Sequence, residues 1–190
     1  MTAGGAANRS SLAVVVVSYN VADLLRACLT ATFASLADSP ELDATVHVVD
    51  NASADGSAEM VAREFPQIRL IQNAVNVGVA AGWNQGVRET RGELVVVMNP
   101  DVEVHPNWLT RIHAALEAHP QADVAGIKLL FPNGRIQHGG LLFHPNAQSF
   151  HRAAHEEDRG QVDAVEPITA VTGAVFAVRR SALEALGGFD

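Results

Sequence analysis

The sequence has few of the features that mark secreted, membrane-spanning or disulfide-bonded proteins. Among its 190 residues Cys28 is the single cysteine, which excludes an intramolecular disulfide and is compatible with a reducing compartment. No apolar run approaches the roughly 20 residues that span a bilayer, and Met1 to Ser11 lacks the apolar segment of a signal peptide. We therefore expect a soluble cytoplasmic domain, with the inner face of the membrane as the alternative location.

Basic residues are also scarce. The 13 basic and 21 acidic residues give a formal net charge of −8, which argues against a nucleic-acid partner because such proteins need many positive contacts to phosphates. A bound diphosphate would have to be held locally, by a bridging cation or by helix amino termini. The sequence carries no signal for an oligomeric state.

Several common nucleotide and metal motifs are missing. The spacing of Gly78, Gly82 and Gly86 does not match the dinucleotide motif G-x-G-x-x-G, and no G-x-x-x-x-G-K-[ST] occurs. The loop after the first apolar run lacks the glycines and basic residue of a nucleotidyltransferase. Although His151 and His155 have i, i+4 spacing, there is no H-E-x-x-H, and we interpret these histidines as solvated rather than as zinc ligands.

What the sequence does contain is a regular alternation of apolar runs and helix-like stretches. The runs, rich in β-branched residues, are Leu12–Val17, Val46–Val49, Ile68–Ile71 and Leu94–Met98. Continuous apolar runs of this length are typical of parallel strands buried on both faces. The pattern predicts one Rossmann-like α/β domain over residues 12–190, with a mostly parallel sheet flanked by helices, preceded by a disordered tail over residues 1–11.

The alternation breaks down near residue 130, where we expect a small antiparallel extension. In order, the sequence predicts a strand over Val124–Leu130, a hairpin turn over Phe131–Arg135, a mobile loop over Pro145–Gln161, and strands over Val165–Val171 and Val175–Val178. Asn20 and Ser181 have the position and chemistry of helix N-caps.

Three polar motifs directly follow predicted strands. They are Ser18-Tyr19-Asn20, the stretch from Asp50 to Ser57, and Asn99-Pro100-Asp101. Because ligands of open α/β sheets bind beyond the carboxyl ends of the strands, one crevice should collect Tyr19, Asp50 and Asp101. Carboxylates, amides and hydroxyls in one crevice suit a nucleotide and a divalent cation.

The individual residues have alternative interpretations. Asp50 can accept hydrogen bonds from a ring imide and a ribose hydroxyl, or it can belong to a capped strand-to-helix turn. Asp55 is better placed to cap a helix than to bind a ligand. Asp101 is a candidate Mg²⁺ or Mn²⁺ ligand, the alternative being a turn residue.

Later motifs also have two interpretations. Asn76, Gly78 and Asn84 lie at the start of a helix at the same edge, where Gly78 and Gly82 either admit a ligand or serve helix packing. His138, which follows a predicted strand near the same face, is a candidate contact to a sugar or phosphate.

Taken together, these motifs resemble the family 2 glycosyltransferases of the GT-A fold. The resemblance spans Leu12 to Asp190 and also includes Thr172-Gly173-Ala174 and Gly187-Gly188-Phe189-Asp190. The Asn-Pro-Asp variant is similar to rhamnosyltransferase-like members that build bacterial surface polysaccharides. The resemblance implies nucleotide binding by Ser18, Tyr19, Asn20, Asp50, Asn76, Gly78, Asn84 and Asn99, a Mg²⁺ or Mn²⁺ ion at Asp101, and a sugar and acceptor pocket at His138, Gly173 and Ala174.

The same resemblance implies an inverting transferase. It would move a sugar from a UDP- or dTDP-sugar to a hydroxyl of a saccharide or lipid-linked acceptor. Members of the family carry the general base beyond the segment that Gly187–Asp190 resembles, so we expect no catalytic base in this chain, and weak nucleotide binding with little or no transfer. The alternative is a non-catalytic module that binds a nucleotide or sugar.

Overall fold

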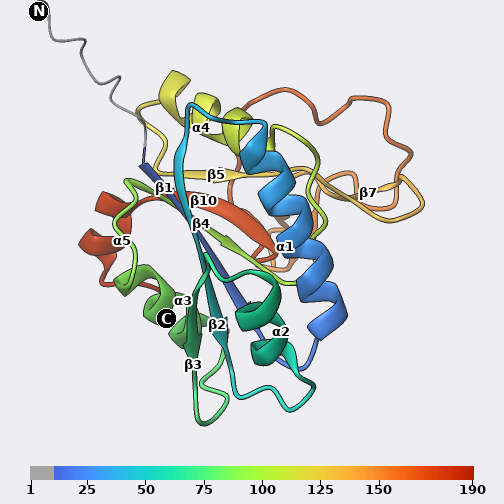
Figure 1. Cartoon of the computed structure of the whole chain (residues 1–190). Helices are drawn as coiled ribbons and strands as arrows, with labels where there is room; N and C mark the ends of the chain where they lie inside the picture. The colour runs from blue at the N-terminus through green and yellow to red at the C-terminus, as the bar shows by residue number, and fades with distance from the viewer. Residues whose placement is uncertain (1–10) are drawn as a thin grey trace, which may run out of the picture.

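Six strands form one mixed sheet in the computed structural model, which describes residues 11–190 (Figure 1). Along the chain they are β1 (Ser11–Ser18), β2 (Asp43–Asp50), β3 (Arg69–Gln72), β4 (Leu94–Met98), β5 (Val124–Gly126) and β10 (Val175–Arg179). Their order across the sheet is β3-β2-β1-β4-β10-β5. Strands β1 to β4 pair in parallel, whereas β10 is antiparallel to both β4 and β5, so the mostly parallel sheet is confirmed.

Helices cover both faces of this sheet. One core contains side chains of α1 (Ala22–Ala37), α2 (Ser57–Glu64) and α4 (Trp108–Ala118), and the other contains side chains of α3 (Val79–Arg88) and α5 (Arg180–Leu186). Successive residues of a strand point to opposite faces. Val14 and Val16 of β1 therefore lie in the first core and Val15 and Val17 in the second. Burial on both faces explains why the run is apolar without alternation.

Helix α3 packs unusually close to β1 because two of its residues lack a side chain. A Cβ built at Gly82 would lie 2.9 Å from the Val17 methyls, and one at Gly86 would lie 2.3 Å from Cγ1 of Val15. Of the two roles open to Gly82, helix packing is therefore the one that the structure supports.

The predicted strand over Val124–Leu130 is wrong as a single element. It divides into β5 and β6 (Leu129–Leu130), which belong to different sheets, and β6 pairs with β7 (Ile136–His138) across the predicted hairpin turn. Between them, Lys128 leaves the main sheet and pairs with Asp158 at 2.8 Å and Asp163 at 2.5 Å. These ion pairs lie in a segment that shows no strand periodicity, so the sequence pattern did not indicate them.

Two further predictions in the extension are corrected. Part of the expected mobile loop is strand β9 (Ser149–His151), which forms a hairpin with β8 (Leu141–Phe143). No strand forms over Val165–Val171, where only Ala170 makes an isolated bridge, to Leu141. The apolar residues of that stretch are instead spread along an irregular segment, of which Val171 packs against the second core.

Both predicted helix N-caps are wrong. Helix α1 begins after Val21, and Asn20, with φ of 55°, accepts a hydrogen bond from the Ala54 amide instead. Helix α5 begins at Arg180, which places Ser181 inside its first turn. Gly187, with φ of 82°, ends α5.

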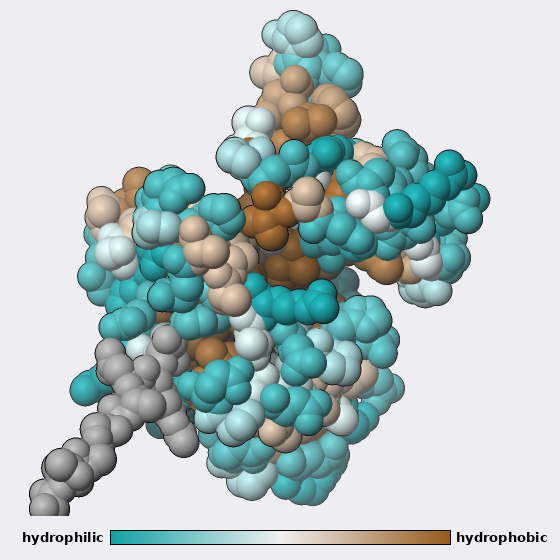
Figure 2. Space-filling model, turned by 90° about the horizontal axis from the view of Figure 1, so that it is seen from above, coloured by the Kyte–Doolittle hydropathy of each residue, from teal (hydrophilic) through white to brown (hydrophobic). Residues whose placement is uncertain are grey.

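The remaining expectations concern the surface and the amino terminus. Ser11 belongs to β1 rather than to the predicted tail, and residues 1–10 of that tail lie outside the described residues. Within residues 11–190, no helix combines the length and apolar character needed to span a membrane. Seen from above, the surface is mainly hydrophilic, with apolar side chains gathered around a central hollow (Figure 2).

Candidate functional site

A hollow of about 410 Å³ opens beyond the carboxyl ends of β1 and β4. The chain runs from β1 outward through β2 and β3 and then returns to place β4 on the other side of β1, so this hollow lies where the strand order reverses. Open α/β sheets bind their ligands at this reversal. Its lining residues are Val17, Ser18, Tyr19, Val21, Leu24, Asn51, Asn76, Gly78, Val79, Asn99, Pro100 and Asp101.

Asp50 lies behind this lining rather than on it. It is the register partner of Ser18 across β1 and β2, and only 3% of its surface is exposed. Its Oδ2 accepts a hydrogen bond from the Ser53 amide at 2.9 Å. Within residues 11–190, Oδ1 of Asp50 and Oγ of Ser18 have no hydrogen-bond partner. A buried carboxylate oxygen without a donor is costly, so Asp50 and Ser18 keep unused acceptor capacity within the described chain.

The sequence did not single out Asn51, which organises one wall of the hollow. Its Nδ2 donates to the Gly78 carbonyl at 3.2 Å, and its Oδ1 accepts from Nδ2 of Asn73 at 2.9 Å. Asn73 also donates to Oε1 of Gln85 on α3. These bonds tie the ends of β2 and β3 to the loop that carries Asn76 and Gly78. The only available signal was the position of Asn51 directly after Asp50.

Asp101 is the one charged side chain that lines the hollow, and it is exposed. The other polar groups are amides and hydroxyls, and Tyr19, Leu24 and Val79 are each about half exposed. An apolar wall with hydrogen-bonding groups suits a base and a ribose. Without a basic residue in the lining, a diphosphate would be repelled by Asp101 unless a cation lay between them.

The oxygen atoms available at the hollow suit a hard divalent cation that takes most of its ligands from substrate phosphates and water. The described residues contain no cluster of three or more His, Cys, Asp and Glu side chains that could hold a metal. Asp101 offers carboxylate oxygens, and the neighbouring Asn99 offers an amide oxygen. Mg²⁺ in particular usually takes one or two carboxylates together with substrate phosphates and water.

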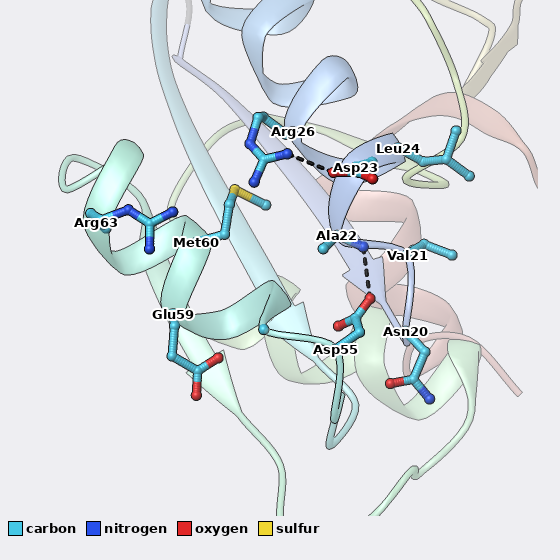
Figure 3. Close-up of a pocket in the computed structure, with 11 residues that line it drawn as sticks. Asn20, Val21, Ala22, Asp23, Leu24, Arg26, Asp55, Glu59, Met60 and Arg63 are labelled. Atoms are coloured by element: carbon cyan, nitrogen blue, oxygen red, sulfur yellow. Dashed lines mark hydrogen bonds and ion pairs between the residues drawn. The ribbon is translucent and has the colours of Figure 1, made fainter.

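Asn20 and Asp55 lie at a second hollow, of about 630 Å³, between the first turns of α1 and α2 (Figure 3). Oδ2 of Asp55 accepts from the Ala22 amide at 2.8 Å, and Oδ1 accepts from the Ser57 amide and hydroxyl. The Ser57 hydroxyl is the main reason why the pKa of Asp55 lies below its usual value. Asp55 thus holds the starts of two helices together, which agrees with its predicted capping role.

Asn20 joins the loop after β1 to the loop after β2. The backbone amide of Asn20 donates to Oγ of Ser53 at 3.0 Å, and its side-chain Oδ1 accepts from the backbone amide of Ala54 at 2.8 Å. The structure therefore places Asn20 beside the hollow that contains Tyr19, as a link between loops rather than as part of its lining.

The remaining predicted residues divide between the hollow and more distant positions. The Ala174 carbonyl accepts a hydrogen bond from the Asn99 amide at 2.7 Å, which brings the Gly173-Ala174 turn beside the hollow. Asn84 makes two hydrogen bonds to the backbone of Phe189 and does not line the hollow. The sequence spacing alone did not show this long-range contact.

His138 and the single cysteine, Cys28, are both buried. His138 is 1% exposed, and its Nδ1 lies 2.9 Å from Nδ1 of His151. Burial, together with His151, lowers the pKa of His138 to about 4. Burial likewise raises the pKa of the Cys28 thiol to about 12, so this cysteine is not an activated nucleophile.

The fold resembles two solved structures that were determined with nucleotide sugars. A mannosyltransferase from Pyrobaculum calidifontis, in complex with GDP-Man and Mn²⁺, has a TM-score of 0.67 and 24% sequence identity over 94% of this chain and 47% of its own. Staphylococcus aureus TarS residues 1–349, in complex with UDP-GlcNAc, has a TM-score of 0.66 and 20% identity over 94% of this chain and 48% of its own. These likenesses confirm the expected GT-A fold.

Sequence comparison gives the family. An N-acetylglucosaminyl-diphospho-decaprenol L-rhamnosyltransferase of Mycobacterium tuberculosis is 27% identical over 206 aligned positions, which cover 94% of this chain. The chain spans 64% of the length of that relative and about half of the two solved structures. The family model for glycosyl transferase family 2 matches residues 13–187, so the chain belongs to this family.

Proposed function

We propose that this chain is the donor-binding part of an inverting glycosyltransferase and that a nucleoside-diphosphate sugar binds in the hollow beyond β1 and β4. Tyr19 and Asp50 would hold the base and ribose. Ser18, Asn76, Gly78 and Asn99 would contact the nucleotide around them. Asp101 would take a divalent cation, and the Gly173-Ala174 turn would border the transferred sugar.

One observation carries this proposal. At the reversal of the strand order, the hollow brings Ser18, Tyr19, Asn76, Gly78, Asn99 and Asp101 together from three separate parts of the sequence. Ser18 of this lining and its register partner Asp50 each carry a buried oxygen without a partner among residues 11–190. A ring imide N–H and a ribose hydroxyl are donors that these oxygens can accept.

The cation would be Mg²⁺ or Mn²⁺. When bound, it supplies positive charge that offsets the charge of the departing nucleoside diphosphate. The Pyrobaculum mannosyltransferase, which contains Mn²⁺ with its donor, supports this choice. Asp101 provides the carboxylate on the protein side, and the backbone of Asn99 is fixed by its hydrogen bond to Ala174.

The transfer step would be a single displacement at the anomeric carbon. The acceptor hydroxyl gives its proton to a carboxylate base and forms the new glycosidic bond while the bond to the nucleoside diphosphate breaks, which inverts the configuration. This chain's own residues bind and orient the donor. The mycobacterial relative supports a deoxysugar donor and a lipid-linked acceptor, and such an acceptor would place the reaction at the inner face of the membrane.

Calorimetry with UDP, dTDP and GDP, each with and without Mn²⁺, tests the proposal. We expect binding of at least one nucleotide, with Mn²⁺ strengthening it in the wild type and not in Asp101→Asn. Glu103→Gln, an exposed acidic position that does not line the hollow, is the matched control and should behave as the wild type. No heat with any nucleotide, or an equal effect of both substitutions, would contradict the proposal.

A further inference from the structure

We infer that Asn84 is a positioning residue that supports the sugar end of the hollow through Phe189 and Trp83 and does not itself contact the nucleotide. Only its expected effect on ligand binding rests on the proposed function. Its structural basis is a pair of hydrogen bonds between α3 and the segment that follows α5, which we call the Asn84 clamp.

The Asn84 clamp uses both polar atoms of the side chain. Nδ2 of Asn84 donates to the Phe189 carbonyl at 2.7 Å, and Oδ1 accepts from the Phe189 amide at 2.9 Å. Gly188 makes this approach possible, because its φ is +107° and a Cβ there would lie 2.6 Å from Oδ1 of Asn84. A nucleotide contact by this amide would compete with bonds that it already makes.

The clamp fixes Phe189 in an aromatic cluster. The Phe189 ring lies against Trp83, with centroids 5.3 Å apart, and against Phe176, with centroids 6.0 Å apart. Trp83 and Phe176 also meet edge to face at 6.0 Å. These edge-on arrangements are favourable for aromatic pairs. Since Trp83 and Asn84 are adjacent on α3, one helix holds both the ring and the backbone of Phe189.

The cluster lies under the turn that borders the hollow. A Cβ built at Gly173 would lie 3.6 Å from Cη2 of Trp83, so the indole lies beside this turn. The next residue, Ala174, accepts the hydrogen bond from the Asn99 amide at 2.7 Å. Packed interiors transmit displacements because they contain little free volume. Releasing Phe189 should therefore loosen Trp83, the turn and finally the backbone of Asn99.

The direct test is amide hydrogen exchange in Asn84→Ala. We expect exchange of the Asn99 amide to accelerate about tenfold, the factor for loss of about one hydrogen bond of support. The Asn51 amide, which donates to the Ser18 carbonyl at the same edge of the sheet, should keep its rate. Gly188→Ala breaks the same clamp from the other side and should reproduce the effect, whereas Arg88→Ala, an exposed position on the same helix, should not.

Fluorescence provides a second measurement that needs no ligand. The sequence contains two tryptophans, so Trp108→Phe leaves Trp83 as the only one. In that background, Asn84→Ala should shift the emission of Trp83 to longer wavelength, because the ring loses its cover. Arg88→Ala should leave the emission unchanged.

Binding then separates positioning from direct contact. Using UDP-GlcNAc, GDP-mannose and a dTDP-sugar with the corresponding nucleoside diphosphates, we expect Asn84→Ala to weaken the nucleotide sugar about tenfold and the nucleoside diphosphate less than about twofold. Equal weakening of both ligands with unchanged Asn99 exchange would make Asn84 a nucleotide ligand and overturn the inference. Equal acceleration at Asn99 and Asn51 would overturn it as global destabilisation. If the wild type binds no nucleotide, the proposed function fails, and exchange and fluorescence still decide the role of the clamp.

Discussion

Replacing Asp50 by asparagine should separate binding from stability. The Asp50 side chain is almost fully buried, and Oδ1 has no partner within residues 11–190. In the structure the Ser53 amide donates to Oδ2 of Asp50 at 2.9 Å, and the side-chain oxygen of asparagine can accept the same hydrogen bond. The substitution also removes a buried negative charge. Its new amide donor lies beside Ser18, whose hydroxyl oxygen is also without a partner in the described chain.

The expected magnitudes follow from these contacts. The free energy of unfolding of Asp50→Asn should stay within about 1 kcal/mol of the wild-type value. Removing the buried charge is favourable and burying a new amide donor is unfavourable, so the two effects nearly cancel. A hydrogen bond from a ligand to a charged acceptor contributes about 1.5–3 kcal/mol. Its loss should therefore weaken nucleotide binding by roughly 10- to 150-fold.

Urea unfolding and calorimetry on the same preparation measure the two quantities. Asp43→Asn, at the exposed opposite end of β2, is a matched control that should change neither. If Asp50→Asn loses about 3 kcal/mol or more of stability and keeps the nucleotide affinity of the wild type, then Asp50 is a structural residue and the reasoning fails.

Three further predictions concern packing, the hydrogen bonds of Arg180, and pH. Gly86→Ala places a Cβ 2.3 Å from Cγ1 of Val15 and should lower the free energy of unfolding by about 1–3 kcal/mol in urea, whereas Ala81→Gly, an exposed position on the same helix, should cost about 1 kcal/mol or less. Arg180→Ala removes the guanidinium that donates to the Gly92 carbonyl at 2.7 Å and to the Thr90 hydroxyl. It should lower the free energy of unfolding, measured by thermal denaturation, by about 1.5–3 kcal/mol. A loss below about 0.5 kcal/mol would show that water replaces these bonds. Because burial lowers the pKa of His138 from 6.5 to about 4, the unfolded chain binds a proton that the folded chain does not between these values. The free energy of unfolding should therefore fall as the pH drops through this range, by at most about 1.4 kcal/mol per pH unit, and His138→Phe should remove that part of the slope.

The parallel part of the fold could be predicted because its signal is local. Each strand from β1 to β4 is a short apolar run followed by a helical pattern, and burial on both faces leaves no other use for so many β-branched residues. The position of Asp101 and Tyr19 at one edge follows from strand direction alone. Strand direction therefore predicts that Ser18, Tyr19, Asn99 and Asp101 lie together, and all four line the hollow.

The errors arose where long-range contacts override local pattern. Asn20 looks like an N-cap, yet its carboxamide accepts from Ala54, which is 34 positions away. The partner of Asn84 is likewise distant, because its side chain binds the backbone of Phe189, 105 positions away. Lys128 lies inside the predicted strand, yet it pairs with two acidic residues that follow it by 30 and 35 positions. Neither periodicity nor motif spacing carries information about such partners.

The central claim is that a nucleoside diphosphate and a divalent cation meet at Asp101 beyond the carboxyl ends of β1 and β4. Paramagnetic broadening of backbone amide signals by Mn²⁺, recorded with and without UDP, tests it most directly. We expect UDP to make Mn²⁺ broaden the backbone amide signals of Asn99, Asp101 and Tyr19. The signal of Arg179, which pairs with Leu94 at the opposite end of β4, should stay sharp. Broadening that is the same with and without UDP, or that is strongest at Arg179, would contradict the proposed site.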